Sequence, residues 1–300
     1  MKPFTLAWGD HRLIMGPRTL VMGIVNVTPD SFSDGGLFLG RDDAIDQGLR
    51  LMDEGADILD IGGESTRPFS EAVPQDEELR RVIPVITALA RRGSIPISID
   101  TTKSEVARQA LEAGASIIND ISALRVDPAL AEIAGKFGVP IILMHMLGIP
   151  KTMQIDPVYE DVVAEVGAFL RQAIETAIQA GIDARRIIVD PGIGFGKTFH
   201  HNLQLLHHLP ALHALGCPIL VGSSRKAFIR HLLKPPYEKD IRADLPIVAT
   251  GTQATVAAAA LNGAHIVRVH EVAETRTTLK IIDAIRNAAS GFPDQPQEVS

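Results

Sequence analysis

Eight short apolar runs, each ending in a polar or charged residue, are the feature of this chain that most limits its fold. They alternate with segments patterned as helices, and repeated strand-then-helix units are typical of a parallel α/β fold. Eight such units in 300 residues predict a (β/α)8 barrel, in which the active-site groups lie just past the C-terminal ends of the strands. The residues that end the runs are Asn26, Asp60, Asp100, Asn119, His145, Asp190, the segment leading to Lys226, and Arg268 with His270.

The expected strands are almost continuously apolar and rich in β-branched residues, as strands buried on both faces are. They lie at residues 20–26, 57–61, 96–100, 116–120, 140–145, 187–190, 218–222 and 265–269. Helical patterns fill the intervals, at residues 41–54, 76–92, 103–113, 128–137, 157–180, 201–215, 250–262 and 271–287. We expect residues 1–288 to form one barrel domain, with a short hairpin in residues 1–19 that caps its bottom, and residues 289–300 to form a flexible tail.

Two of the expected loops are too long to be simple connections. Residues 26–40 follow the first strand and residues 62–75 follow the second, and both loops are polar and contain glycine and proline. Long loops at the C-terminal face of a barrel are usually functional lids. We therefore expect both loops to belong to the active site.

The composition argues against several classes of protein. A net charge of −7 disfavours a general binder of nucleic acid or of anionic membranes, although a local basic cluster can still bind a small anion. The most apolar later stretch, residues 249–260, is too short and polar to span a membrane, and the N-terminus lacks the apolar segment of a signal peptide. We expect a cytoplasmic protein, in which the single cysteine, Cys217, is a small buried residue.

Three of the strand endings, Asp100, Asn119 and Asp190, suit one kind of ligand. A carboxylate accepts two parallel N–H groups, and an amide offers both an acceptor and a donor. Together they match the edge of a 2-amino-4-oxo heterocycle such as a pterin or guanine. The alternative is that each side chain caps the helix that follows it, as Asp100 can before residues 101–106.

Basic residues at neighbouring strand ends predict an anion site. Residues 224–228 (SRKAF) follow the seventh strand and residues 268–270 (RVH) follow the eighth, where barrels often bind phosphate. Arg268 and His270 are two apart and so share one face of a strand, while Arg67 adds a third cation from the second long loop. We interpret this set as a diphosphate site.

Two other motifs are not expected to bind ligands in the way that they first indicate. Residues 192–198 (GIGFGKT) resemble a phosphate-binding loop, but Pro191 occupies the position of its first glycine. Five histidines between residues 200 and 213 lie on a predicted surface helix, with no cysteine nearby and no carboxylate at ligand spacing. We expect a polar helix face there rather than a zinc site.

With these residues in view, the chain closely resembles the bacterial dihydropteroate synthases, the pterin-binding transferases of folate biosynthesis. The resemblance covers nearly the whole barrel, in the order of the family. The matching stretches are residues 22–36 (MGIVNVTPDSFSDGG), 60–68 (DIGGESTRP), 97–107 (ISIDTTKSEVA), 117–124 (IINDISAL), parts of 145–154, 187–198 (IIVDPGIGFGKT), parts of 221–226, and 263–275 (GAHIVRVHEVAET).

The resemblance implies a (β/α)8 barrel that forms a homodimer and uses Mg²⁺. The family condenses 6-hydroxymethyl-7,8-dihydropterin diphosphate with p-aminobenzoate, which gives 7,8-dihydropteroate and diphosphate. It also implies ordered binding, with the pterin diphosphate first, because the two long loops would close to exclude water that competes with the amine. The implied partners are therefore small molecules and a second copy of the chain, not nucleic acid or membrane.

The resemblance assigns a role to each matching position. It implies a pterin pocket with catalytic Lys226, formed by Asp100, Asn119, Ile121, Met144, Asp190, Phe195 and Lys226. It implies a diphosphate site formed by Asn26, Thr66, Arg67, Arg268 and His270, with Asn26 as the Mg²⁺ ligand. It implies p-aminobenzoate surroundings formed by Phe32, Thr66, Pro68 and Ser224. Asp34 would stabilise the positive charge on the reacting pterin, while Arg67, Arg268 and His270 would stabilise the departing diphosphate.

The chain departs from the family pattern at a few positions. Phe69 stands where glycine commonly follows TRP, and Leu147 and Ile149 replace more polar residues, which puts p-aminobenzoate and sulfonamide affinity in doubt. Ala227 and Glu271 replace a frequent serine and aspartate outside the charged centre.

Two alternative functions are weighed against the synthase. A pterin-binding methyltransferase barrel would not need residues 26–36, the SRK segment or the Arg268/His270 pair. A non-catalytic pterin-binding paralogue is expected to lose residues such as Asp34 or Lys226, which this chain retains.

Overall fold

The barrel predicted from the sequence is present in the computed structural model, which describes residues 2–27, 37–65 and 70–288. Its strands are β1 Phe4–Trp8, β2 His11–Met15, β3 Leu20–Asn26, β4 Ile58–Gly62, β5 Ile97–Asp100, β6 Ile117–Asp120, β7 Ile141–Met144, β8 Ile187–Asp190, β9 Leu220–Val221 and β10 Ile266–Val269. Within these residues, β3 to β10 form one parallel sheet of 8 strands in the order β8-β7-β6-β5-β4-β3-β10-β9. A parallel bridge between Val189 and Ile219 joins its two edges and closes the barrel.

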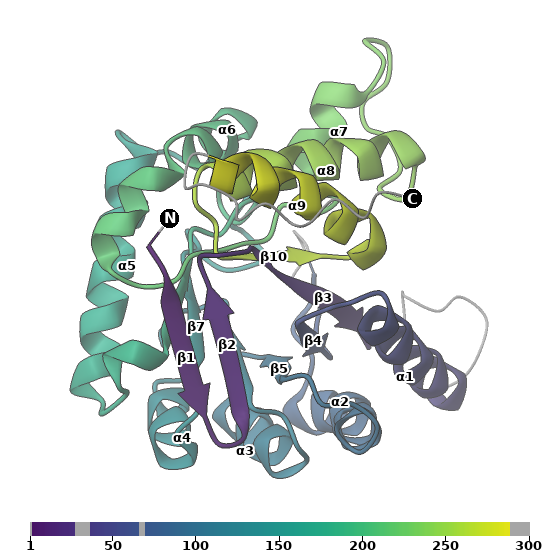
Figure 1. The fold of residues 1–300 in the computed structure, drawn as a ribbon, viewed down its shortest axis with the longest axis vertical. Helices are drawn as coiled ribbons and strands as arrows, with labels where there is room; N and C mark the ends of the chain where they lie inside the picture. The colour runs from purple at the N-terminus through teal and green to yellow at the C-terminus, as the bar shows by residue number, and fades with distance from the viewer. Residues whose placement is uncertain (1, 28–36, 66–69, 289–300) are drawn as a thin grey trace, which may run out of the picture.

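Helices surround the strands as a ring (Figure 1). They are α1 Leu37–Asp53, α2 Gln75–Ala90, α3 Ser104–Glu112, α4 Ala129–Phe137, α5 Val162–Gln179, α6 Phe199–His207, α7 Ala227–Leu233, α8 Pro246–Leu261 and α9 Val272–Asn287, with short 3₁₀ helices η2 Ala184–Arg186 and η3 Leu209–Leu215. Because a (β/α)8 barrel pairs each strand with a covering helix, this arrangement confirms the predicted fold class.

Several helices differ from the predicted ranges. Helices α1 and α8 each begin about four residues before the predicted start, at Leu37 and Pro246. The predicted helix at 201–215 is α6 followed by η3, since Pro210 has no N–H with which to continue an α-helix. Helix α5 begins at Val162 rather than near 157, because the Asp161 side chain accepts hydrogen bonds from the next turn and fixes the start there. The short helix α7 was not predicted, since seven residues are too few for a helical period to be recognised.

The strands are buried on both faces, as their composition predicts. Every residue of β4, β6, β7 and β8 is buried, because the inner face fills the barrel and the outer face packs against helices. These strands and the helix faces around them form one continuous apolar cluster. A rigid frame of this kind fixes the positions of the residues at the strand ends.

The predicted N-terminal hairpin is present and caps the N-terminal end of the barrel. Strands β1 and β2 pair antiparallel, and their buried side chains join the main core. His265, which directly precedes β10, accepts a hydrogen bond from Ile219 N at Nδ1 (3.0 Å) and contacts Lys2 O through Nε2 (3.1 Å). The hairpin lies in front of the strands in Figure 1, so that view looks toward the end of the barrel opposite the site residues.

Two smaller observations complete the fold. Cys217 is buried, at 5% exposure, as expected. Within residues 2–27, 37–65 and 70–288, no helix has the length and apolarity needed to cross a bilayer.

Candidate active site

The strand register brings three predicted site residues to one level of the barrel. Asn26 pairs with Gly62, Gly62 with Asp100, and Asp100 with Asn119. Because paired residues in adjacent parallel strands face the same way, the three polar side chains are neighbours around the C-terminal mouth. Asp100 packs directly beside Gly62: its Cβ lies 3.5 Å from the point where a Gly62 Cβ would be, which is an ordinary van der Waals contact.

Arg268 connects the carboxylates at this mouth. Its Nε donates to Asp60 Oδ2 at 2.6 Å, and its Nη2 donates to Asp100 Oδ2 at 2.9 Å. Asn119 Nδ2 also donates to Asp60 Oδ2, at 3.1 Å. The predicted diphosphate residue Arg268 and the predicted pterin residues Asp100 and Asn119 thus belong to one network, and Asp60 is at its centre.

Asp190 and Lys226 form the other side of the mouth. Asp190 is only 5% exposed and its Oδ1 accepts a hydrogen bond from Gly192 N at 2.7 Å. Gly192 has a φ of +68°, and a Cβ there would lie 1.9 Å from His145 O, so only glycine allows this turn. The Nζ atom of Lys226 lies 4.0 Å from the centre of the Phe195 ring, a cation–π contact that orients the lysine.

The buried charges of the mouth shift one another's pKa values. Burial raises the pKa of Asp100 to about 7, although Arg268 opposes the shift, and the charge of Asp60 raises it further. Burial also raises the pKa of Asp190 to about 6, against the hydrogen bond from Gly192. Burial and the charge of Arg268 lower the pKa of Lys226 to about 8. All three groups therefore titrate near neutral pH, which is typical of a functional site.

An apolar patch separate from the main core lines one side of this charged region. It consists of Ile121, Met144, Met146, Met153 and Phe195. Three of these, Ile121, Met144 and Phe195, are the apolar walls that the family resemblance implies. Met146 and Met153 were not predicted, because each lies in a loop beyond a strand end, where sequence periodicity gives no signal.

A buried pair, Lys197 and His145, packs against the glycine-rich turn of residues 192–196. Lys197 is 2% exposed, and its Nζ lies 2.9 Å from His145 Nδ1 and donates to Phe195 O at 3.0 Å. Burial and the charge of Lys197 lower the pKa of His145 to about 3, so neutral His145 accepts this hydrogen bond. Burial lowers the pKa of Lys197 to about 7. The lysine in GIGFGK therefore holds the loop, and it is not aimed at solvent as a phosphate-binding lysine would be.

Ser224 and His270, predicted for different substrates, are in direct contact. Ser224 Oγ lies 2.9 Å from His270 Nδ1 and donates to Glu271 Oε2 at 3.4 Å. Glu271 also forms an ion pair with Arg225. The unusual Glu271 thus holds the serine and the arginine of the SRK segment beside the end of β10.

Of the remaining predicted site residues, only Asn26 lies in the part of the chain that the structure describes. Phe32, Asp34, Thr66, Arg67 and Pro68 lie outside the described residues. Asn26 is part-exposed at the end of β3, and no hydrogen bond joins its side chain to another residue of the described part. An available amide oxygen fits Mg²⁺, which keeps several waters and combines few protein oxygens with substrate phosphates.

No group of three or more His, Cys, Asp or Glu side chains able to hold a metal ion occurs within residues 2–27, 37–65 and 70–288. Of the histidines near α6, His201 forms a capping box with Thr198, which is a structural role. The described residues at the mouth therefore offer separate carboxylate and amide oxygens and do not surround a metal ion on all sides.

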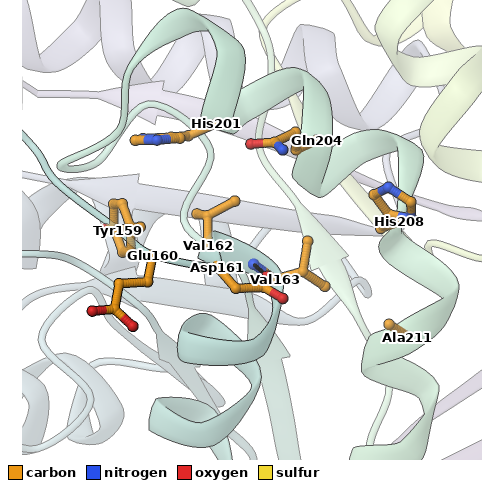
Figure 2. Close-up of a pocket in the computed structure, with 9 residues that line it drawn as sticks. All are labelled: Tyr159, Glu160, Asp161, Val162, Val163, His201, Gln204, His208 and Ala211. Atoms are coloured by element: carbon orange, nitrogen blue, oxygen red, sulfur yellow. Dashed lines mark hydrogen bonds between the residues drawn. The ribbon is translucent and has the colours of Figure 1, made fainter.

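A hollow of about 520 Å³ lies elsewhere on the molecule. Figure 2 shows it between the start of α5 and the helices α6 and η3, lined by Tyr159, Glu160, Asp161, Val162, Val163, His201, Gln204, His208 and Ala211. It contains none of the predicted site residues. Asp161 is already used as the cap of α5, and the Tyr159 hydroxyl donates to Gly196 O at 2.7 Å. We therefore assign the chemistry to the strand ends, where the buried charges lie.

Asp60 is the main residue of this network that sequence reasoning left without a role. It ends an apolar run just as Asp100 does, so the same signal was present in the sequence. Lys197 gave a weaker signal, since a buried lysine cannot be distinguished from an exposed one by its neighbours in the chain.

Known proteins share both the sequence and the fold. The family model described as "Pterin binding enzyme" matches residues 22–270. A dihydropteroate synthase of Synechocystis is 48% identical over 283 residues, which cover 94% of this chain and 96% of the relative. A structure of the Xanthomonas albilineans dihydropteroate synthase with 4-aminobenzoic acid is 47% identical, has a TM-score of 0.84, and the match covers 95% of this chain and 99% of that one.

A second structure of the Xanthomonas albilineans enzyme, in complex with 7,8-dihydropteroate, is 47% identical with a TM-score of 0.79, and covers 91% of this chain and 96% of that one. Sequence identity and fold therefore agree over almost the full length. This chain belongs to the dihydropteroate synthase family of pterin-binding enzymes.

Proposed function

We propose that this protein condenses 6-hydroxymethyl-7,8-dihydropterin diphosphate with p-aminobenzoate to give 7,8-dihydropteroate and diphosphate, the transferase step of folate biosynthesis. The observation that carries the proposal is the convergence of Asp100, Asn119, Asp190 and Lys226 on one mouth with Arg268. The related Xanthomonas albilineans enzyme binds 4-aminobenzoic acid and 7,8-dihydropteroate in its structures, which supports the same pair of ligands here.

The pterin ring is bound through its hydrogen-bonding edge. Ionised Asp190 and Asp100 accept its N–H groups, and the Asn119 amide pairs with a further ring position. Protonated Lys226 donates to the carbonyl and ring-nitrogen side. Ile121, Met144 and Phe195 cover the flat faces of the ring, which suits a patch that is apolar and already assembled.

The diphosphate is bound by Arg268 and His270, with Thr66 and Arg67 from the second long loop. Bound at Asn26, Mg²⁺ would neutralise part of the negative charge that develops on the diphosphate as it leaves. Ser224, Phe32, Thr66 and Pro68 surround p-aminobenzoate. The contact between Ser224 and His270 brings the two half-sites together, as a transfer between two substrates requires.

The reaction breaks the C–O bond to diphosphate and forms a C–N bond to the amine, which then loses one proton. Positive charge spreads into the electron-rich dihydropterin ring as the C–O bond lengthens, and Asp34 stabilises that charge. The arylamine is neutral at pH 7, so positioning contributes more than a strong base does. We also expect ordered binding, with p-aminobenzoate entering after the pterin diphosphate, because water that reached the site would compete with the amine.

The direct test measures diphosphate release by the purified protein with Mg²⁺ and the pterin diphosphate, with and without p-aminobenzoate. We expect release to increase with p-aminobenzoate, together with formation of 7,8-dihydropteroate. Tight pterin binding without product would favour the non-catalytic paralogue. Transfer of a methyl group from methyltetrahydrofolate would favour the methyltransferase barrel. The homodimer and the cytoplasmic location stay predictions.

A further inference from the structure

Asp60 lies beneath the mouth of the barrel and touches two residues with different predicted roles. It is two residues before Gly62 on β4, so it faces the same way one layer deeper, and it is 0% exposed. Its Oδ2 accepts hydrogen bonds from Arg268 Nε at 2.6 Å and from Asn119 Nδ2 at 3.1 Å. Its Oδ1 is buried and has no hydrogen-bond partner among the described residues.

We propose that Asp60 is the positioning residue of this active site: it orients Asn119 and Arg268 together, and so couples pterin recognition to diphosphate binding. The inference rests on the proposed function. Because Asp60 is fully buried beneath the layer of Asp100 and Asn119, it acts through the side chains that it contacts, Asn119 and Arg268.

The hydrogen bond to Asp60 decides which end of the Asn119 amide the ligand meets. An ionised carboxylate only accepts, so the amide must turn its Nδ2 toward Asp60. Its Oδ1 is then directed away from Asp60 and is available as an acceptor. Without Asp60, either end of the Asn119 amide could face the pterin. In one of these two orientations the amide NH₂ would face a donor of the pterin, or the amide oxygen would face an acceptor, and no hydrogen bond would form.

The same carboxylate keeps Arg268 in place when Asp100 binds a ligand. Arg268 contacts both Asp60 and Asp100 here. If Asp100 accepts N–H groups of the pterin, the pterin competes with Arg268 for the Asp100 carboxylate. Asp60 lies below the ligand layer and retains the Nε contact, so the guanidinium stays oriented and its charge stays compensated. A buried carboxylate oxygen without a partner lowers stability, which argues that this arrangement is retained for function.

The matched variants are Asp60→Asn and Ser98→Ala. Ser98 pairs with Asp60 in the strand register, is 0% exposed, and its hydroxyl has no partner among the described residues. It therefore controls for a change inside the barrel that removes no hydrogen bond to Asn119 or Arg268. Asp60→Asn keeps the shape of the side chain and removes its charge.

We expect Asp60→Asn to weaken binding of 6-hydroxymethylpterin about tenfold or more, measured by calorimetry, because a charge-assisted contact to Arg268 is lost. The KM for p-aminobenzoate at saturating pterin diphosphate should stay within about twofold, since Ser224, the predicted p-aminobenzoate residue within the described part of the chain, contacts His270 and Glu271 rather than Asp60. Ser98→Ala should match wild type in both measurements. In a double-mutant cycle, Asp60→Asn should weaken pterin binding less in the Arg268→Ala background than in wild type, because only the part of its effect that acts through Asn119 then remains.

A change in pH dependence separates positioning from a purely structural role. The charged groups that act on Asp100 are Arg268, Asp60, Glu78, Asp120 and Lys226. Removing the negative charge of Asp60 should lower the pKa of Asp100, so the acid limb of pterin binding should move to lower pH in Asp60→Asn. Ser98→Ala should not move it.

Wild-type pterin affinity with an unmoved acid limb in Asp60→Asn would overturn the proposal. Full additivity with Arg268→Ala would overturn it as well. If Asp60→Asn does not fold, Asp60→Ser is measured instead, and failure of both to fold would assign Asp60 to barrel stability. The two proposals fail in different measurements. If the wild-type protein binds pterin but forms no product, the proposed function is wrong, and the effect of Asp60→Asn on pterin binding can still be measured.

Discussion

Two carboxylates close together in the chain, Asp57 just before β4 and Asp60 within it, show how the two ends of the barrel differ. Asp57 directly precedes β4 at the N-terminal end, and both of its oxygens are bonded. Arg18 donates to Oδ1 at 2.6 Å and to Oδ2 at 2.9 Å, and Val21 N donates to Oδ2 at 2.8 Å. Arg276 lies 2.9 Å from the same Oδ2. Asp60, three residues later, has bonds on one oxygen only.

The contrast indicates what each end of the barrel does. At the N-terminal end, the protein itself satisfies the charge, so the contacts contribute to stability. At the C-terminal end, several charged groups are buried with incomplete partners, and their pKa values lie near neutrality. Binding sites often retain such unfavourable arrangements because the ligand completes them.

The largest expected effect would follow from Asp190→Asn, which neutralises a carboxylate of the C-terminal end. Pterin affinity should fall about 100-fold, because the new amide NH₂ opposes a ring N–H. Ionised Asp190 carries a raised pKa of about 6, so it lowers stability above that pH, and the variant should melt at or above the wild-type temperature at pH 8. Calorimetry and thermal melts test both points. Unchanged pterin affinity would remove Asp190 from the pocket.

The pH profile of kcat/KM for the pterin diphosphate should be bell-shaped. Activity should increase from pH 5 as Asp190 and Asp100 ionise, because the pKa values of these carboxyls are about 6 and about 7. It should decrease above about pH 8 as Lys226 loses its proton, since the pKa of that amine is about 8. Steady-state rates in a constant-ionic-strength buffer series give the profile. A flat profile across these values would contradict the assignment of charged forms to binding.

The smallest effect on activity, but a measurable effect on stability, is expected for Asp57→Asn. The variant loses ion pairs with Arg18 and Arg276, so its free energy of unfolding should fall by about 1–3 kcal/mol. Its kcat/KM should stay within about twofold of wild type, because the change lies at the opposite end of the barrel. Urea denaturation and initial rates test this. Arg185→Ala, which breaks an ion pair whose arginine is 86% exposed, is the control and should not differ from wild type. Loss of activity in Asp57→Asn without loss of stability would contradict the division between the two ends.

Much of the fold was predictable because its signals are local. A strand buried on both faces is a continuous apolar run, and its polar last residue is visible in the sequence, so Asp100, Asn119 and Asp190 were found as a set. Their contacts with a common neighbour were not predictable. Whether Asp60 bonds Arg268 depends on the stagger of strands 208 residues apart in the chain.

Burial and local backbone shape account for most of the other differences. The sequence does not distinguish the buried Lys197 from an exposed lysine, and only its packing against His145 does so. The break between α6 and η3 depends on one proline, which the periodicity of 201–215 masked. Short elements such as α7 have too few residues for a periodic pattern to be recognised.

The closure between β8 and β9 has a mechanical consequence for the whole molecule. Strand β9 has two residues. One bridge, from Val189 of β8 to Ile219 just before β9, joins this segment to β8, whereas β9 is joined to β10 through two paired positions. The cylinder is therefore weakest along this one line, where breathing motions should begin. Asp190 ends β8 on one side of the line, and Lys226 follows β9 on the other. A ligand held by both would fasten the barrel at its weakest joint, so occupancy of the site and rigidity of the scaffold would increase together.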